Sequence, residues 1–574
     1  MVNWKSKKLG DLLTLTNALV ALVLINLLAS FHFFRLDLTE EKRYSIKQPT
    51  RDLLEKLDDV VYVDVYLEGD LNAGFKRFQT SIKETLEEFR IYSDNKVRYT
   101  FSNPAAAMGQ KAQSEFMNEL AAKGIQALPV IESKDGQKTE KIVFPGALIS
   151  YGGMEMGVML FKSRYKDGKM FNPNSQDVLN ESIEGLEYEL VSAIHKLTSS
   201  NQRNIGFTSS HGELNSLEVA GLKSTISENY VVKKTDLTQP VTDCDVLIIA
   251  KPTQPFSEKE KYELDQFIMR GGKLVALIDK LDARMDSASS DTNFAFPYDL
   301  KLDDQFFKYG VRINADLIQD RVSSKYPVVI SNAGKPQMMK MDWPFYPLIN
   351  QYADHVITRN LDASLLKFVS SIDTVKAVGV KKTPLLFSSA YSRKVSTPVK
   401  ISINDLRKNV NPESFNEGPV PVGYLLEGNF TSVFRNRFLP EGVDKSTFVE
   451  QGQSKIILVA DGDLARNDVN PKTGNPQQLG FDPFSNYTFS NQDLIMNMIA
   501  YLSDEKGLIS VRNKEVKIRP LDREKIRANR TYWQGLNLLA PLVLLVVFGV
   551  VRAFWRKKKY SGFSKKQADV FENK

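Results

Sequence analysis

Two long apolar runs lie near the two ends of the chain. Leu12 to Phe34 contains 23 residues without a charge, and Thr531 to Val551 contains 21. At a rise of 1.5 Å per residue, a helix of either length covers a hydrocarbon core about 30 Å thick. We therefore predict two transmembrane helices, residues 12–34 and 531–551, which flank one large module exposed to water.

The first apolar run differs from a cleaved signal peptide. A signal peptide has a shorter apolar core, followed by small residues at the cleavage site. Here the sequence Phe-His-Phe-Phe occupies positions 31–34, where small residues would be needed. We interpret this run as an uncleaved signal anchor.

The distribution of basic residues predicts the orientation in the membrane. Lys5, Lys7 and Lys8 precede the first run, and a basic cluster at residues 552–559 follows the second. Basic flanks favour the cytoplasm. We expect residues 1–11 and the tail 552–574 in the cytoplasm, and the main domain in the periplasm of a bacterial inner membrane. The linker 506–530 is also basic and favours the opposite orientation.

Composition excludes several classes of function. The formal charge of +7 is dispersed over 574 residues, so no nucleic-acid partner is indicated. A single cysteine, Cys244, rules out a disulfide framework or a Cys-rich metal site. No Gly-x-x-x-x-Gly-Lys-Ser/Thr and no Gly-x-Gly-x-x-Gly after a strand occurs, so we expect no nucleotide cofactor, and no other cofactor is indicated.

The region between the apolar runs has an alternating strand and helix pattern, so the predicted fold class is α/β. Residues 35–200 form a first α/β domain with hairpins. Residues 201–285 and 451–505 form a flavodoxin-like or amidotransferase-like parallel sheet, because continuous apolar runs such as Asp245–Ala250 are typical of buried parallel strands. Residues 286–450 are predicted to be an inserted mixed subdomain.

Polar residues follow two of the predicted strands. His211 and Glu213 come after the strand at 204–209, and Asp461 and Asp463 come after the strand at 455–460. Open α/β sheets bind ligands at the carboxyl ends of their strands. These four residues are therefore candidate ligand-binding residues. The alternative is that they stabilise loops and turns by local hydrogen bonds.

The sequence indicates neither catalysis nor a metal site. The histidines do not have metal-ligand spacing, although Asp461 and Asp463 could bind a cation with help from carbonyl groups. Cys244 lies between two aspartates at the start of a strand, and adjacent carboxylates raise the pKa of a thiol. We predict that it is inert and that the protein is not an enzyme.

Several segments together resemble one family. They are the stretch Arg35–Ser45, the sequences Glu-Tyr-Glu-Leu at 187–190 and Ser-His-Gly-Glu at 210–213, the unit Asp245–Asp279, and Leu-Glu-Gly-Asn-Phe at 426–430. They are similar to the GldG family, the gliding-motility-associated auxiliary components of ABC transporters in Bacteroidota. The resemblance covers nearly the whole chain. It implies a polytopic permease subunit, a separate P-loop ATPase subunit and an inner-membrane location.

The leading functional hypothesis is a non-enzymatic auxiliary or substrate-binding-type subunit of an ABC transporter that is required for gliding. The alternative is a membrane-anchored periplasmic scaffold that binds another envelope protein without a small ligand. A third hypothesis, a degenerate amidotransferase-like hydrolase, would need Cys244 as its nucleophile.

Overall fold

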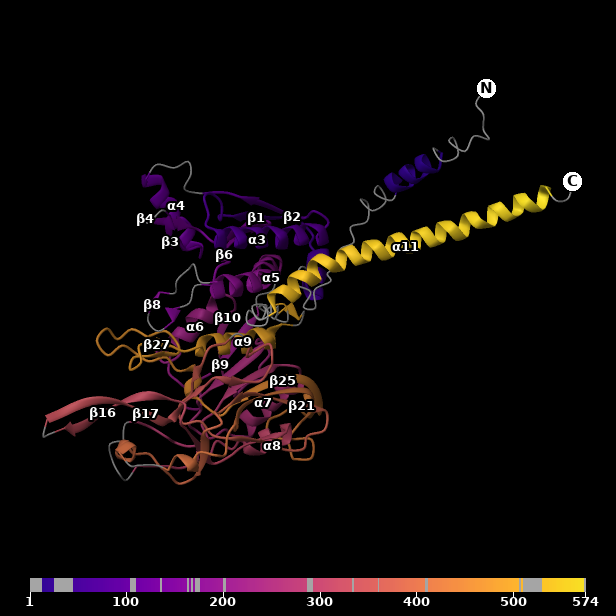
Figure 1. The fold of residues 1–574 in the computed structure, drawn as a ribbon. Helices are drawn as coiled ribbons and strands as arrows, with labels where there is room; N and C mark the ends of the chain where they lie inside the picture. The colour runs from indigo at the N-terminus through magenta and orange to yellow at the C-terminus, as the bar shows by residue number, and fades with distance from the viewer. Residues whose placement is uncertain are drawn as a thin grey trace. The chain divides into compact units, whose positions relative to one another are not determined.

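The computed structural model describes most of the chain and divides it into two units, Met1–Lys514 and Glu515–Lys574 (Figure 1). The described residues are 13–24, 45–103, 110–134, 137–162, 165–166, 169–170, 176–199, 203–285, 293–332, 335–359, 361–407, 411–504, 507–508, 511 and 529–571.

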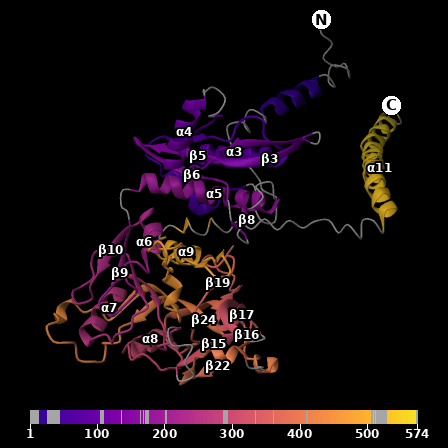
Figure 2. The same cartoon turned by 90° about the vertical axis from the view of Figure 1, so that its left-hand side faces the viewer.

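The first α/β domain contains a four-stranded sheet in the order β2-β1-β5-β6. The strands are β1 (Val61–Val65), β2 (Val97–Phe101), β5 (Gly146–Tyr151) and β6 (Met154–Met159). The helices are α2 (Gln48–Glu55), α3 (Ala73–Tyr92), α4 (Gln110–Ala122) and α5 (Gln176–Thr198), and α5 runs beside β5 and β6 (Figure 2). Two hairpins are added: β3 (Leu128–Lys134) with β4 (Gln137–Val143), and β7 (Tyr165–Lys166) with β8 (Lys169–Met170).

Burial in this domain follows the periodicity of the sequence. In β1 the alternate residues Val61, Val63 and Val65 are fully buried, and Tyr62 between them is half exposed. Helix α3 begins after Asn72, whose side chain accepts a hydrogen bond from the Phe75 amide and so caps the helix. Its buried positions recur every three or four residues, as an amphipathic helix requires: Phe75, Phe78, Ile82, Leu86 and Phe89.

The core of the first domain also includes residues from the far end of the chain. Leu508 and Val511, which follow the last helix of the second domain, are buried in the same cluster as Val63 and Phe78. Ile46, close to the first apolar run in sequence, belongs to this cluster too. One hydrophobic core therefore holds the segments that lead to both terminal helices.

The second domain contains an eight-stranded sheet in the order β10-β9-β11-β12-β25-β24-β21-β18. The first five strands in this order are parallel to one another. Each of the last three is antiparallel to the strand before it in the order. The strands are β9 (Asn204–Thr208), β10 (Val231–Thr235), β11 (Val246–Ala250), β12 (Lys273–Leu277), β18 (Gln351–Tyr352), β21 (Val380–Phe387), β24 (Pro421–Thr431) and β25 (Gln451–Val459). The helices are α6 (Ala220–Ser227), α7 (Glu258–Met269), α8 (Asp303–Tyr309) and α9 (Asn491–Ser503).

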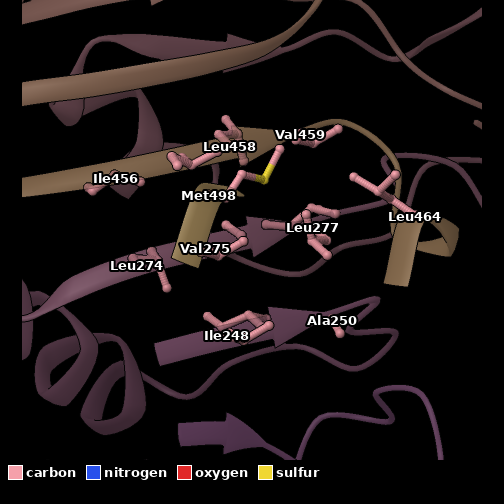
Figure 3. Packing of buried hydrophobic residues seen from close by; sticks show 14 of the residues in the cluster. Ile248, Ala250, Leu274, Val275, Leu277, Ile456, Leu458, Val459, Leu464 and Met498 are labelled. Atoms are coloured by element: carbon pink, nitrogen blue, oxygen red, sulfur yellow. The ribbon is translucent and has the colours of Figure 1, made fainter. Parts of the chain in front are cut away.

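The core of this sheet is formed by side chains of β11, β12 and β25 (Figure 3). Every residue of β11 is buried, as its continuous apolar sequence predicts. Met498 of α9 lies against Leu458 and Val275 (Figure 3). Helix α7 begins with a capping box, in which Ser257 and Glu260 exchange hydrogen bonds.

The structure corrects the prediction that residues 286–450 form a separate insertion. Strands β18, β21 and β24 lie in this range, yet they complete the main sheet, and β24 pairs with β25 from Gly423 to Thr431. Their short local runs did not reveal this, because pairing with β25 supplies the burial that makes β24 a central strand.

Much of the rest of this range packs around a third buried cluster that includes Trp343 and Phe368, while Val311, Ile313 and Ile372 belong to the core of the main sheet. The strand groups are β13 (Phe294–Ala295) with β23 (Val399–Lys400), β14 (Val311–Ile313) with β20 (Ile372–Thr374), β15 (Asp316–Asp320) with β22 (Ser392–Ser396), and β16 (Ser323–Asn332) with β17 (Lys335–Ile349) and β19 (Ser364–Leu365). After this range, β26 (Phe481–Asp482) pairs with β27 (Tyr487–Thr488). The described residues of the second domain also form the 3-10 turns Ile403–Arg407, Pro412–Ser414, Lys445–Thr447 and Asp463–Ala465.

The second unit contains the long helix α11 (Arg530–Phe571). Within it, Arg530–Lys558 is long and apolar enough to cross a membrane, with a mean hydropathy of 2.3 and none of its apolar stretch buried in the protein. This segment includes the predicted run 531–551. The first apolar run is represented by a shorter apolar helix, Leu13–Leu24. The rest of 12–34, the N-terminal residues 1–11 and most of the linker 506–530 lie outside the described residues.

Replacing Met498 with alanine should destabilise the second domain by about 2–5 kcal/mol, because the change leaves a cavity under α9. Met338, which is 71% exposed on β17, provides the matched control. Thermal unfolding of the full-length protein in detergent should show a lower midpoint for M498A and an unchanged one for M338A. Equal midpoints for the two variants would contradict the packing shown in Figure 3.

Candidate functional site

The candidate site lies where four neighbouring parallel strands end. Strands β9, β11, β12 and β25 are adjacent and in register, with Ala250 opposite Leu277 and Leu277 opposite Val459. Each strand is followed within three residues by a charged or ionisable side chain: His211 after β9, Lys251 after β11, Asp279 after β12 and Asp461 after β25. Because the strands are parallel, these side chains gather at one edge of the sheet.

This edge includes the position where the strand order reverses. The chain passes from β9 outward to β10 and then returns to β11 on the other side of β9. The loops after β9 and β11 therefore leave the sheet side by side. They are joined by two hydrogen bonds to the His211 carbonyl, from the amide of Thr253 at 2.8 Å and from that of Gln254 at 2.9 Å.

Gly212 makes this close approach possible. Its φ is +68°, and a Cβ atom at this position would lie 2.3 Å from Thr253 Oγ1. The Thr253 hydroxyl also donates a hydrogen bond to the Gly212 carbonyl at 3.0 Å. Any other residue at 212 would both strain the backbone and push the two loops apart.

His211 is buried between two carboxylates. Its ring stacks on Phe256, with centroids 3.6 Å apart and planes 9° apart. Nδ1 lies 3.6 Å from Glu213 Oε1, and Nε2 lies 3.3 Å from Glu260 Oε2. Glu260 is also the capping residue of α7, so His211 connects the end of β9 to the start of that helix.

The surroundings shift the pKa values of this group. Burial lowers the pKa of His211, but Glu213 and Glu260 raise it by more, so the net pKa is above the usual value. Burial raises the pKa of Glu213, but its hydrogen bonds, led by the one with His211, lower it below the usual value. The arrangement favours a protonated imidazole between two ionised carboxylates.

Lys251 is the cation of a second group. Its Nζ lies 2.8 Å from Asp279 Oδ2 and 2.6 Å from Asp463 Oδ2. Asp461 is fully buried and accepts hydrogen bonds from the amides of Lys367 and Asp463, both at 2.7 Å. Two predicted site residues, Asp461 and Asp463, therefore lie together; Lys251 pairs with Asp463, and backbone amides bind Asp461.

The three carboxyl groups have different pKa values. Burial raises the pKa of Asp279 to about 6, although Lys251 opposes this. Burial and the charges of Asp279 and Asp463 raise the pKa of Asp461 well above its usual range. Burial also raises the pKa of Asp463, but Lys251 and Lys367 lower it by more, and the net pKa is below the usual value.

Close backbone contacts position Lys251 and Asp279. Lys251 has a φ of +56°, a left-handed conformation that is costly for a residue with a Cβ atom. The adjacent loop supplies Gly462, where a Cβ would lie 2.6 Å from that of Lys251. The Gly462 amide donates to Asp279 Oδ1 at 2.5 Å. The loops after β11, β12 and β25 are thus connected through Lys251 and Asp279.

A third set of contacts ties the loop after β25 to α6. Arg466 contacts Glu218 at 2.6 Å and Asp463 at 3.4 Å. The Asn467 side chain accepts a hydrogen bond from the Gly221 amide at 3.0 Å and donates one to the Leu217 carbonyl at 2.9 Å.

The structure brings the two residues of each predicted pair close together. The four side chains are buried and mainly contact other protein groups. His211 and Glu213 form one group, and Asp461 and Asp463 form another, with the loop from Lys251 to Thr253 between them. Sequence reasoning missed Lys251, Glu260, Asp279 and Arg466. Lys251 and Asp279 follow apolar strands directly, so the rule that selected His211 and Asp461 would have found them as well.

Among the described residues, no group of three or more His, Cys, Asp or Glu side chains could hold a metal ion. Cys244 precedes β11, at the opposite end of that strand. Burial raises the pKa of its thiol, and the nearby Asp243 adds to the effect that the sequence had predicted.

The fold and the charged edge define an open α/β domain attached to an apolar helix. The family described as "ABC-type uncharacterized transport system" matches residues 202–498, just over half of the chain, and the chain belongs to this family of auxiliary ABC-transport proteins. A domain of unknown function matches residues 40–150.

An uncharacterized protein of Borreliella burgdorferi is 23% identical and aligns over 96% of this chain and 99% of its own length. Two solved structures each cover 53% of this chain at low similarity: the mmIFT52 N-terminal domain, covered to 98% (11% identity, TM-score 0.31), and PurLQS from Thermotoga maritima, covered to 100% (9% identity, TM-score 0.22). At these scores neither structure supports an argument about fold or function.

Replacing Lys251 with methionine should destabilise the protein by about 3–5 kcal/mol at pH 8, because buried carboxylates lose their cation. Their folded-state pKa values then rise above the unfolded values, so the loss should shrink as the pH falls toward 5. Thermal unfolding at both pH values checks this. Lys233, which pairs with the exposed Asp243, is the control, and K233M should cost at most about 1 kcal/mol. A loss independent of pH would contradict the proposed charge balance.

His211 should make stability depend on pH in the opposite sense to His355. The folded-state pKa of His211 is raised, so its stabilisation is complete below about pH 6.5 and disappears as the pH rises through the folded value. Burial lowers the pKa of His355, so that residue destabilises the fold as the pH falls. Unfolding midpoints measured from pH 5.5 to 8.5 should show H211Q approaching wild type at high pH and H355Q gaining on wild type at low pH.

Proposed function

We propose that this protein is a non-enzymatic auxiliary subunit, of the substrate-binding type, in an inner-membrane ABC transporter that serves gliding motility. Membership of the transport-system family supports the auxiliary role. The resemblance of segments such as Arg35–Ser45 and 210–213 to GldG supports the link to gliding and to Bacteroidota.

The proposal rests on one combination: the chain belongs to a transport-system family, and its sequence contains no ATP-binding motif. The chain belongs to an ABC-transport family, yet its sequence contains no P-loop. Among the described residues, the apolar helices are Arg530–Lys558 and the shorter Leu13–Leu24, and two helices are too few to enclose a transport pathway. The protein would therefore depend on a polytopic permease and a separate P-loop ATPase.

We propose that the carboxyl edge of the second sheet is the binding edge. His211, Glu213 and Asp463 would fix the loops that meet the ligand through ion pairs inside the protein, and Asp461 would do so through hydrogen bonds from backbone amides. Both termini would lie in the cytoplasm and the main domain in the periplasm, as the basic residues outside each apolar run favour.

One observation favours a second function, a membrane-anchored scaffold without a small ligand. The four candidate side chains are each at most 8% exposed and have partners, which suits loop stabilisation as well as it suits ligand contact. A scaffold of this kind would bind another envelope protein through the surface of its α/β domains.

Affinity purification of the intact protein from mild-detergent membranes tests the proposal. We expect a polytopic permease and a P-loop ATPase in near-equal amounts, because a subunit without an ATPase must associate stably with one. A tagged control with the same two terminal helices but an unrelated soluble domain should recover neither. Recovery of envelope proteins alone would contradict the transporter role and favour the scaffold.

A further inference from the structure

An unusually long connection joins two neighbouring antiparallel strands, β24 and β25. Their ladder continues to the pair Thr431 and Gln451, so a tight turn of a few residues could follow. Instead the chain makes an excursion of 19 residues, 432–450, which appears as an orange segment beside α7 in Figure 2. Loops of this length in a compact domain are uncommon and are usually functional.

The base of this loop is firmly held on α7. Asp265, fully buried, accepts hydrogen bonds from the Ser432 hydroxyl at 2.7 Å and the Val433 amide at 3.0 Å. At the other limb, the Gln266 side chain exchanges two hydrogen bonds with the Val449 backbone, at 2.8 and 3.1 Å. Both limbs are therefore fixed to consecutive residues of one helix.

Aromatic packing adds to these polar contacts. Tyr262 of α7 contacts Phe434 edge-to-face at 5.4 Å and stacks with Phe448 at 6.3 Å. Val433 and Phe434 are buried in the same small cluster. The loop has an apolar core of its own and holds a defined shape.

Phe438, between these two limbs, is 100% exposed. Exposing a whole aromatic side chain loses the favourable burial that the same loop gives Phe434 and Phe448. A partner that covers Phe438 would recover this burial, and the fixed loop would lose little conformational entropy on binding.

Two arginines beside Phe438 indicate the chemistry of the partner. Arg435 pairs with Glu450 at 3.1 Å, Arg437 pairs with Asp304 at 2.5 Å, and their side chains remain 45% and 44% exposed. Each guanidinium has five N–H donors, of which these ion pairs use only part. Arg437 is adjacent to Phe438 in the sequence, and Arg435 and Glu441 are each three residues away from it.

We propose that Phe438 inserts into an apolar pocket rimmed by carboxylates on another subunit of the transporter, and that Arg435 and Arg437 bind the rim. This inference rests on the proposed function, which supplies the partner complex. Aromatic residues and arginine dominate the binding energy of protein interfaces. A protein pocket fits better than a lipid surface, because a single exposed phenylalanine gives little membrane affinity and the chain already carries an apolar helix.

The test compares the full-length protein with F438A, F438W and F296A in the same detergent purification. Phe296 is 59% exposed and lies outside this loop, so it is the matched control. We expect F438A to lower the amount of co-purified permease and ATPase at least about tenfold, the effect typical of a central interface residue. F438W and F296A should retain binding. An unchanged thermal midpoint for F438A shows that the loop remains folded.

A photoreactive phenylalanine analogue at position 438 identifies the occupant. Crosslinking to a transporter subunit, at a peptide with acidic and apolar residues, supports the proposal. Crosslinking only to lipid, only to a second copy of this chain or to nothing overturns it, as does full recovery of both subunits with F438A. If wild type itself recovers no transporter subunit, the proposed function fails first, and the inference fails with it.

Discussion

The ammonium group of Lys251 is the contact on which the carboxyl edge of the second sheet depends. It lies within 3 Å of carboxylates that follow two other strands, Asp279 and Asp463. Without it, three buried acidic residues would repel each other in a medium of low dielectric constant. One cation thus fixes the relative positions of loops that the sequence separates by almost 200 residues. The left-handed backbone at Lys251 persists because these contacts repay its strain.

The imidazole of His211 extends the same principle to β9 and α7. The backbone carbonyl of His211 accepts hydrogen bonds from the loop after β11, and the imidazole ring lies between Glu213 and Glu260. The two groups have the same composition, because a basic side chain lies between carboxylates in each: Lys251 in one and His211 in the other. Together they turn the reversal of strand order into a rigid edge.

Local sequence patterns predicted many of the helices and strands. They failed where a strand's place in the sheet depends on pairing with a strand that is far away in the sequence. The continuous apolar run of β11 and the capping box at Ser257 and Glu260 are readable within a few residues. By contrast, β24 is central only because β25 lies beside it. In the site, His211 and Glu213 are near neighbours in sequence and were found as a pair. The position of Lys251 at the end of β11 was readable in the sequence, but its partners were not, because Asp279 and Asp463 follow other strands.

The burial of Leu508 and Val511 in the first domain has a consequence for how the chain folds during synthesis. That domain begins at about residue 45, but two of its core side chains are made only after the entire second domain. Domains usually fold in the order in which the ribosome makes them. Here the first domain must wait, incomplete, until nearly 90% of the chain exists. The first core is complete only when the sequence that shortly precedes α11 has been made.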